Sequence, residues 1–204
     1  MIRLRMMKID SGQGSKKIAG VLLAAGLSTR AGSKNKLLSL VGDRPMVTRV
    51  AEIALAGKLD PIIVVTGHDA KAVSAILTGL DIRICFNPDY RDGMAASIRI
   101  GIASLSNNID GALIMLGDMP WLRDSTIMSL KNAFMPLTGA KILCPVCHGR
   151  LGNPALFSKH FFGALMNLSG DRGAKQLILR EHASRIEVSV DDVGIFRDID
   201  TLSK

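Results

Sequence analysis

A glycine-hinged loop rich in cations follows the first apolar run of the sequence. In residues 20–38, GVLLAAGLSTRAGSKNKLL, an apolar stretch runs into Gly26, and Arg30, Lys34 and Lys36 follow before the chain becomes apolar again. Arginine offers a planar fork, lysine a mobile point charge, and the amides of a glycine-rich turn can face an anion. The loop therefore predicts a triphosphate site, whereas any one of these cations alone would more often be a solvated surface group.

The spacing of this loop excludes two common phosphate-binding motifs. A Walker A loop needs two glycines four residues apart, followed at once by lysine and then serine or threonine. Here five residues separate Gly26 from Gly32, and Ser33 precedes Lys34. The G-x-G-x-x-G spacing of dinucleotide-binding folds is also absent, which removes the main support for an oxidoreductase.

A carboxylate closes the apolar segment ALIMLGDMP, residues 112–120. Asp118 would lie at the mouth of a sheet, where a hard oxygen ligand suits Mg²⁺. From the pattern alone, a metal ligand and a helix-cap or turn aspartate are equally favoured.

The segment DIDT near the C-terminus offers a second carboxylate. Asp198 and Asp200 share one face if this segment is a strand; Asp198 is preferred as the second metal ligand, although either residue would also suit the end of a sheet.

Apolar runs alternate with helical patterns along the rest of the chain. The apolar runs predict strands over residues 18–25, 61–67, 82–86, 112–118 and 141–146. The helical patterns cover residues 45–56, 70–80, 95–105 and 124–134, with Asp124 as the N-cap of the last. This alternation indicates repeated βαβ units and an α/β fold, a three-layer, doubly wound, mostly parallel sheet of Rossmann-like type. Ligands bind beyond the carboxyl ends of the strands in such sheets, and most of the unusual polar residues lie there.

Composition and charge bound the possible partners. The 204 residues predict a basic N-terminal arm, residues 1–17, and a single domain, residues 18–204. Of the net charge of +8, residues 1–36 carry +7, and only 4% of the chain is aromatic. A basic groove with stacking aromatics is therefore not supported, and we expect no nucleic-acid partner. The arm lacks a long apolar region, which argues against a signal peptide and a membrane partner, and three cysteines favour a cytoplasmic location.

One family accounts for these motifs together. LLAAGLSTRAGSKNKLL resembles the signature L-A-A-G-x-S-x-R-x-G-x-x-K-L-L of the MobA-like nucleotidyltransferases, which attach a nucleotide to the molybdenum cofactor. The resemblance continues through VVTGHDA, NPDYRDGMAASIRIGI, LGDMP, RLGNPALF, SGDRGAK and FRDIDT. LAAG, GMAAS and GDRGAK are similar to the cytidylyltransferase branch. Lys36 lies one residue later than the signature lysine, and the Leu-Leu that follows favours it over Lys34.

The resemblance implies a Rossmann-like nucleotidyltransferase fold and a Mg²⁺-dependent transfer of CMP onto the phosphate of molybdopterin, with release of pyrophosphate. It favours CTP over GTP as the donor. Arg30 would clamp the β- or γ-phosphate, Lys36 would contact the α-phosphate and the departing pyrophosphate, and Asp118 would hold the metal ion. Because the attacking phosphate is already ionised at neutral pH, no Ser, Cys or His nucleophile is required.

Further site residues follow from the resemblance. The nucleotide would be bound by Leu23, Ala24, Ala25, Gly26, Arg30, Lys36, Asn87, Gly93 and Ser97. The acceptor would be bound by Gly152, Asn153, Arg172 and Lys175. From the residues alone, Ser97 would equally suit ordinary helix capping, and Arg172 and Lys175 would suit solvated surface.

Several alternatives stay open. The string CPVCH, residues 144–148, matches part of a haem or zinc motif, but two cysteines three apart on a strand point to opposite faces, which favours buried thiols. The acceptor could be a sugar or polyol phosphate instead of molybdopterin. The chain could also be a cofactor-binding chaperone with a molybdoenzyme as its partner.

Overall fold

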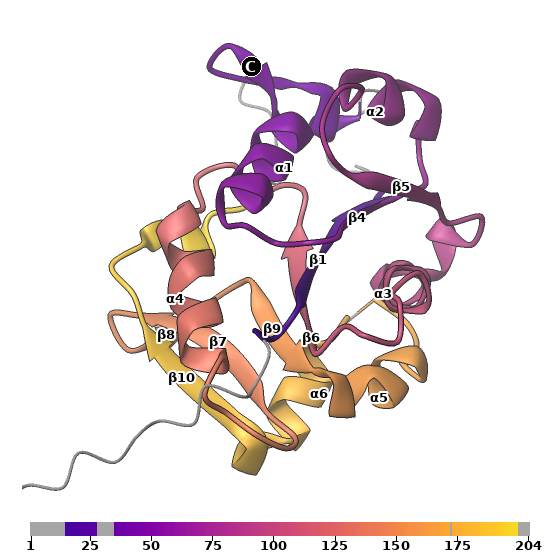
Figure 1. The fold of residues 1–204 in the computed structure, drawn as a ribbon. Helices are drawn as coiled ribbons and strands as arrows, with labels where there is room; N and C mark the ends of the chain where they lie inside the picture. The colour runs from indigo at the N-terminus through magenta and orange to yellow at the C-terminus, as the bar shows by residue number, and fades with distance from the viewer. Residues whose placement is uncertain (1–14, 28–34, 172, 200–204) are drawn as a thin grey trace, which may run out of the picture.

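A computed structural model describes residues 15–27, 35–171 and 173–199. Its main sheet has eight strands: β1 (Ile18–Ala24), β4 (Ile62–Thr66), β5 (Arg83–Phe86), β6 (Gly111–Leu116), β7 (Ile142–Cys147), β8 (Arg150–Leu151), β9 (Ala155–Ser158) and β10 (Arg185–Ser189). The strand order is β10-β7-β9-β6-β1-β4-β5, with β8 paired to β7 (Figure 1). A separate hairpin joins β2 (Leu40–Val41) to β3 (Arg44–Pro45).

Most of the pairing is parallel, as the sequence predicts. β1 pairs in parallel with β4 and β6, β4 with β5, and β7 with β10. β9 lies antiparallel between β6 and β7, and β8 is antiparallel to β7. The α/β class and the mostly parallel sheet are confirmed.

Helices cover both faces of this sheet. One core cluster joins residues of α1 (Met46–Ala56), α2 (Ala70–Ile76) and α4 (Asp124–Phe134) to the sheet. The opposite cluster includes residues of α3 (Met94–Ala103), α5 (Phe162–Met166) and α6 (Lys175–Arg180). Leu22 of β1 belongs to the first cluster and Val21 and Leu23 to the second, so a strand buried on both faces separates two helical layers (Figure 1).

Strand β7 carries the two cysteines of the CPVCH string. Cys144 packs in the cluster of α3 and α6, whereas Cys147 packs in the cluster of α1 and α4. The two thiols therefore lie on opposite faces of the sheet, as the strand pattern predicts. Burial raises the pKa of the Cys144 thiol to about 11, so this thiol stays protonated at neutral pH.

All five predicted strands and all four predicted helices are present, but two local predictions are wrong. α2 ends at Ile76 rather than Leu80, and a glycine with positive φ, Gly79, follows it. Arg123, not Asp124, is the N-cap of α4. For the DIDT segment the sequence leaves the strand open; Asp198 lies outside any strand, and Asp200 lies outside the described residues. Within the described part of the chain, no helix is both long and apolar enough to span a membrane.

Candidate active site

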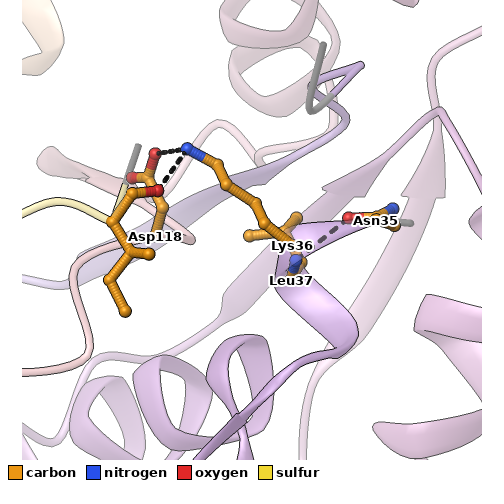
Figure 2. Close-up of polar contacts among 5 residues, drawn as sticks. Asn35, Lys36, Leu37 and Asp118 are labelled. Atoms are coloured by element: carbon orange, nitrogen blue, oxygen red, sulfur yellow. Dashed lines mark hydrogen bonds and ion pairs between the residues drawn. The ribbon is translucent and has the colours of Figure 1, made fainter. Parts of the chain in front are cut away.

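An ion pair joins the cation-rich loop to the end of β6. Lys36 begins a single 3-10 turn, Lys36–Leu38, after β1, and its Nζ donates to Oδ2 of Asp118 at 2.7 Å (Figure 2). The same Nζ donates to the carbonyl oxygen of Ile199 at 2.8 Å. Both charged side chains are largely covered, at 15% and 21% exposure, so solvent screens their attraction less than on an open surface.

Local backbone geometry fixes the two partners. Asn35 caps the 3-10 turn by accepting a hydrogen bond from the Leu37 amide at 3.0 Å, and its Nδ2 donates to the His68 carbonyl at 3.2 Å. On the other side, the Gly117 amide donates to the Leu23 carbonyl at 3.0 Å. A Cβ at position 117 would lie 2.9 Å from that oxygen, so a glycine allows the chain to stay against β1 just before Asp118.

A cavity of about 510 Å³ opens beside the ion pair, at the carboxyl ends of β1 and β6. Its described lining includes six of the predicted nucleotide-site residues: Leu23, Ala25, Gly26, Lys36, Gly93 and Ser97. Asp118 lines it as well. Ala24 faces the α1 and α4 core instead. Arg30 and Lys34 lie outside the described residues.

Asn87 lies behind the cavity wall and supports Ser97. The Asn87 side chain is fully buried, and its Nδ2 donates to Ser97 Oγ at 3.0 Å. Its Oδ1 accepts from the Asp89 amide at 3.0 Å, and its own amide donates to the Thr66 carbonyl at 2.8 Å. Ser97 is not the cap of α3, because the N-cap is Gly93. The hydroxyl of Ser97 is thus held at the cavity by Asn87, the residue that follows β5.

Gly93 brings the SGDRGAK segment to the same cavity. Its φ of 92° and ψ of −179° suit only glycine, and a Cβ there would lie 2.2 Å from Oδ1 of Asp171. The Ala95 amide donates to the Gly170 carbonyl at 3.1 Å. Asp171 consequently lines the 510 Å³ cavity, as do Tyr90 and Arg91. All three residues belong to segments that resemble family motifs, NPDYRDGMAASIRIGI and SGDRGAK. No local pattern in the sequence indicates that these two segments meet.

A second cavity of about 330 Å³ adjoins the first and shares Met94 and Leu116 with it. It brings together three of the predicted acceptor residues, Gly152, Asn153 and Lys175. The rest of its lining is mostly apolar and includes Ile98, Ile114, Cys144, Phe157 and Ile178. Arg172 lies outside the described residues. The predicted donor and acceptor sites therefore meet at a common wall.

The carboxylates can be tested against the needs of a metal ion. Mg²⁺ is usually held by one or two carboxylates together with substrate phosphates and water. Asp118 offers one such carboxylate at the cavity. Asp198 is exposed, and among the described residues no group of three or more His, Cys, Asp or Glu side chains is placed to hold a metal ion. Within residues 15–27, 35–171 and 173–199, the donor set therefore fits a Mg²⁺ that arrives with a phosphate chain.

Solved structures resemble this fold over nearly its whole length. Rv0371c from Mycobacterium tuberculosis H37Rv is 28% identical with a TM-score of 0.81, covering 92% of this chain and 95% of that one. A structure of the same protein in complex with manganese is 26% identical with a TM-score of 0.71, covering 87% and 89% of the two chains. A nucleotidyl transferase from Methanothermobacter, 20% identical with a TM-score of 0.78 and covering 91% and 92% of the two chains, shares the fold.

Sequence comparison gives two kinds of relative. Nicotine blue oxidoreductase of Paenarthrobacter nicotinovorans is 29% identical over 92% of this chain and 94% of its own length. The bifunctional protein GlmU of Pelobacter propionicus is 28% identical over 88% of this chain but only 37% of its own length, so the chain spans little more than a third of that relative. The model of the MobA-like NTP transferase domain matches residues 20–186, a segment that contains Lys36, Asp118 and Ser97. The chain therefore belongs to the MobA-like NTP transferase family.

Proposed function

We propose that this chain is a Mg²⁺-dependent cytidylyltransferase that moves CMP from CTP onto the phosphate of molybdopterin. The observation that carries the proposal is the Lys36–Asp118 pair, 2.7 Å apart on the wall of a 510 Å³ cavity. A cation and a carboxylate so placed suit a triphosphate and its metal ion, and the manganese complex of Rv0371c supports a divalent ion in a related chain.

The reaction is an in-line substitution at the α-phosphorus. A phosphate oxygen of the acceptor forms the new P–O bond while the bond from the α-phosphorus to the oxygen bridging to the β-phosphorus breaks, and pyrophosphate carries away the electron pair. Asp118 would hold Mg²⁺, which supplies charge neutralisation on the phosphates when bound. Lys36 would then exchange the carboxylate for the α-phosphate. Positioning and charge neutralisation are the main catalytic needs of such a transfer.

The two ends of the site would orient the substrates. On the donor side, Ser97, held by Asn87, and the open backbone at Gly93 would contact the nucleoside. Preference for CTP is supported by the LAAG, GMAAS and GDRGAK motifs. On the acceptor side, Lys175 and Asn153 would bind molybdopterin in the second cavity, and its shared wall with the first would bring the attacking phosphate toward the donor.

Pyrophosphate release tests this proposal. The protein is incubated with Mg²⁺, molybdopterin and, separately, CTP, GTP and ATP. We expect release that is fastest with CTP and that requires molybdopterin. Pyrophosphate release only with a sugar or polyol phosphate would show that this compound, and not molybdopterin, is the acceptor. No release with any acceptor would refute nucleotidyltransferase activity and favour a cofactor-binding chaperone.

Two variants of one strand give a matched comparison. Asp118→Ala removes the carboxylate after β6, and we expect a loss of at least about 10³-fold in the rate because the metal ion loses its protein ligand. Asp110→Asn removes a charge at the opposite end of β6, where the carboxylate accepts from the Lys17 amide at 2.8 Å. We expect a near-normal rate for Asp110→Asn, and a near-normal rate for Asp118→Ala would refute the assignment.

A second candidate function is oxidoreductase activity. It is favoured by the relative named nicotine blue oxidoreductase, which aligns over 94% of its own length. Oxidoreductase activity is tested by measuring the consumption of NADH and NADPH with a quinone dye as electron acceptor. We expect no consumption above that of the free cofactor, because the chain lacks the glycine spacing of a dinucleotide fingerprint.

A further inference from the structure

Residues 191–199, which we call the C-terminal strap, cross from the start of α4 to the ion pair. At the start of the strap, Asp192 is a carboxylate with 2% exposure. Its Oδ2 accepts from the Arg123 amide at 2.9 Å and from Thr126 Oγ1 at 2.7 Å, and its Oδ1 accepts from the Gly194 amide at 2.8 Å. The N-cap of α4, Arg123, makes no side-chain cap hydrogen bond, and this carboxylate from a distant part of the chain accepts from its amide and stabilises the start of the helix.

The middle of the strap is held against the acceptor side. The Asn153 amide donates to the carbonyl oxygen of Ile195 at 2.9 Å, and the Ile195 side chain is fully buried. A Cβ on Gly152 would lie 2.5 Å from Ile195 Cγ1, so the turn that lines the second cavity rests directly on the strap. The position of Gly152 and Asn153 thus depends on the path of residues 192–195.

The end of the strap is held against the ion pair. The Ile199 amide donates to the Asp118 carbonyl at 3.0 Å, and the Ile199 carbonyl accepts from Lys36 Nζ at 2.8 Å. Just before it, the Arg197 guanidinium lies 4.4 Å from the ring centroid of Trp121. Gly194 is pressed against the same residue, because a Cβ there would lie 2.1 Å from the Trp121 carbonyl.

We propose that Asp192 is a positioning residue for the transfer reaction, acting through the strap on both the Asp118–Lys36 pair and the Gly152–Asn153 turn. The expected effect on catalysis rests on the proposed function, whereas the expected release of the strap does not. Asp192 lines neither of these two cavities, so it would act on the reaction through the strap and without contact to a substrate bound there. Its charge is anchored by three hydrogen bonds in a buried place, and such bonds are costly to lose. Loss of this anchor would release the strap and loosen the metal end and the acceptor end together.

The test compares Asp192→Asn with Asp124→Asn. Asp192→Asn keeps the shape of the side chain, but it replaces one accepting oxygen with an amide N–H₂, which cannot accept from the amide and hydroxyl donors around it. The second removes a charge from the first turn of the same helix, where the exposed carboxylate accepts from the adjacent Ser125 amide. Amide hydrogen exchange by NMR is read at Ile199 and Asn153, with the Asn87 amide, bonded to the Thr66 carbonyl, as internal reference.

In Asp192→Asn we expect exchange at both Ile199 and Asn153 to rise at least about tenfold with Asn87 unchanged. The emission of Trp121, the single tryptophan of the chain, should shift because Arg197 leaves its ring. With CTP and molybdopterin, kcat should fall about tenfold and the acceptor KM should rise, while the CTP KM changes less than about twofold. Asp124→Asn should change none of these.

Faster exchange only at residues 123–126 would overturn the proposal, as would exchange that rises at Asn87 to the same extent. If Asp192→Asn does not fold, Thr126→Val decides, since it removes one donor to the carboxylate at nearly constant volume. An increase of about threefold at both Ile199 and Asn153 in that variant supports the strap, and no change refutes it. The exchange measurement stands even if no transfer activity is found, so failure of the strap and failure of the proposed function are distinguishable.

Discussion

The two cavities on either side of Met94 and Leu116 differ in chemistry although they share a wall. The described lining of the larger carries the charged residues Lys36, Arg91, Asp118 and Asp171, whereas Lys175 is the charged residue in the described lining of the smaller. The larger is thus suited to a charged chain with its metal ion, and the smaller to a flat apolar group with one anionic end.

The difference in chemistry follows from the strands that build each cavity. The larger lies at the carboxyl ends of the parallel strands β1 and β6, where polar loops gather. The smaller is lined by residues of β6, β7 and β9, with α3 and α6 above them, and β9 runs antiparallel to both of its neighbours. Side chains standing on the sheet surface are apolar because they continue the core. The strand ends therefore supply the charged groups that a transfer reaction needs, and the sheet face supplies an apolar surface that can select a substrate by its shape.

Replacing Lys36 should give the largest effect in this comparison. Lys36→Ala removes the cation that faces Asp118, and we expect kcat to fall about 10²- to 10³-fold because charge on the departing pyrophosphate is no longer neutralised. The acceptor KM should change little, since the second cavity does not contain this residue. Steady-state kinetics, with the CTP and acceptor concentrations varied in turn, measure kcat and the acceptor KM. An effect confined to the acceptor KM would contradict the assignment of donor and acceptor to separate cavities.

Replacing Lys175 should give the opposite pattern. We expect Lys175→Gln to raise the acceptor KM about tenfold by removing a charge-assisted hydrogen bond, with the CTP KM unchanged. Lys159→Gln is a suitable control, because that lysine lies before α5, outside both cavities, and donates to the Asn107 carbonyl. A rise in the CTP KM for Lys175→Gln would show that the two cavities do not separate the substrates.

Replacing Ser97 should affect the donor side mildly. Ser97→Ala removes one hydroxyl at the larger cavity and leaves Asn87 Nδ2 without its partner, so we expect the CTP KM to rise about three- to tenfold. Isothermal titration with CTP and Mg²⁺ measures the same loss without an acceptor. An unchanged affinity would place the nucleoside elsewhere in the cavity.

Cys144 gives the smallest effect and reports on the smaller cavity. Its thiol pKa is raised from 9.0 to about 11 by burial, so the folded protein favours the protonated thiol. The unfolded chain ionises this thiol near pH 9, and the free energy of unfolding should therefore fall by about 1–2 kcal/mol between pH 9 and 11. Below pH 9 this contribution is fully present.

Chemical denaturation of the parent and of Cys144→Ala at several pH values checks this prediction. The variant should be less stable at pH 8 because it loses buried volume, but its stability should decline less steeply above pH 9. Equal slopes for the two proteins would show that the thiol is not shielded from solvent in the folded state.

The strand ends were predictable from the sequence and the long-range supports were not. Apolar runs followed by glycine and charge pointed to Gly26 and Asp118, and the Leu-Leu of the family signature pointed to Lys36; the structure places all three on one cavity. The structure also pairs Asp118 with Lys36, the lysine that the following Leu-Leu favours. Strand β10, RIEVS, was missed because it is half exposed and lacks an apolar run.

Asp192 was missed for a different reason. Its hydrogen-bond partners Arg123 and Thr126 lie 69 and 66 positions away in the chain, and no local pattern connects them. Asp124 looked like the cap of α4 because aspartate before an apolar-periodic segment usually is one. The N-cap is Arg123, and the carboxylate that accepts from its amide is Asp192, which follows β10 in the chain.

A crystal structure of the protein with CTP and Mg²⁺ tests the central claim most directly. We expect the triphosphate in the larger cavity, Mg²⁺ on the Asp118 carboxylate, and Lys36 Nζ moved from Asp118 to the α-phosphate. CTP bound in another part of the molecule, or an intact 2.7 Å ion pair beside a bound triphosphate, would contradict the account.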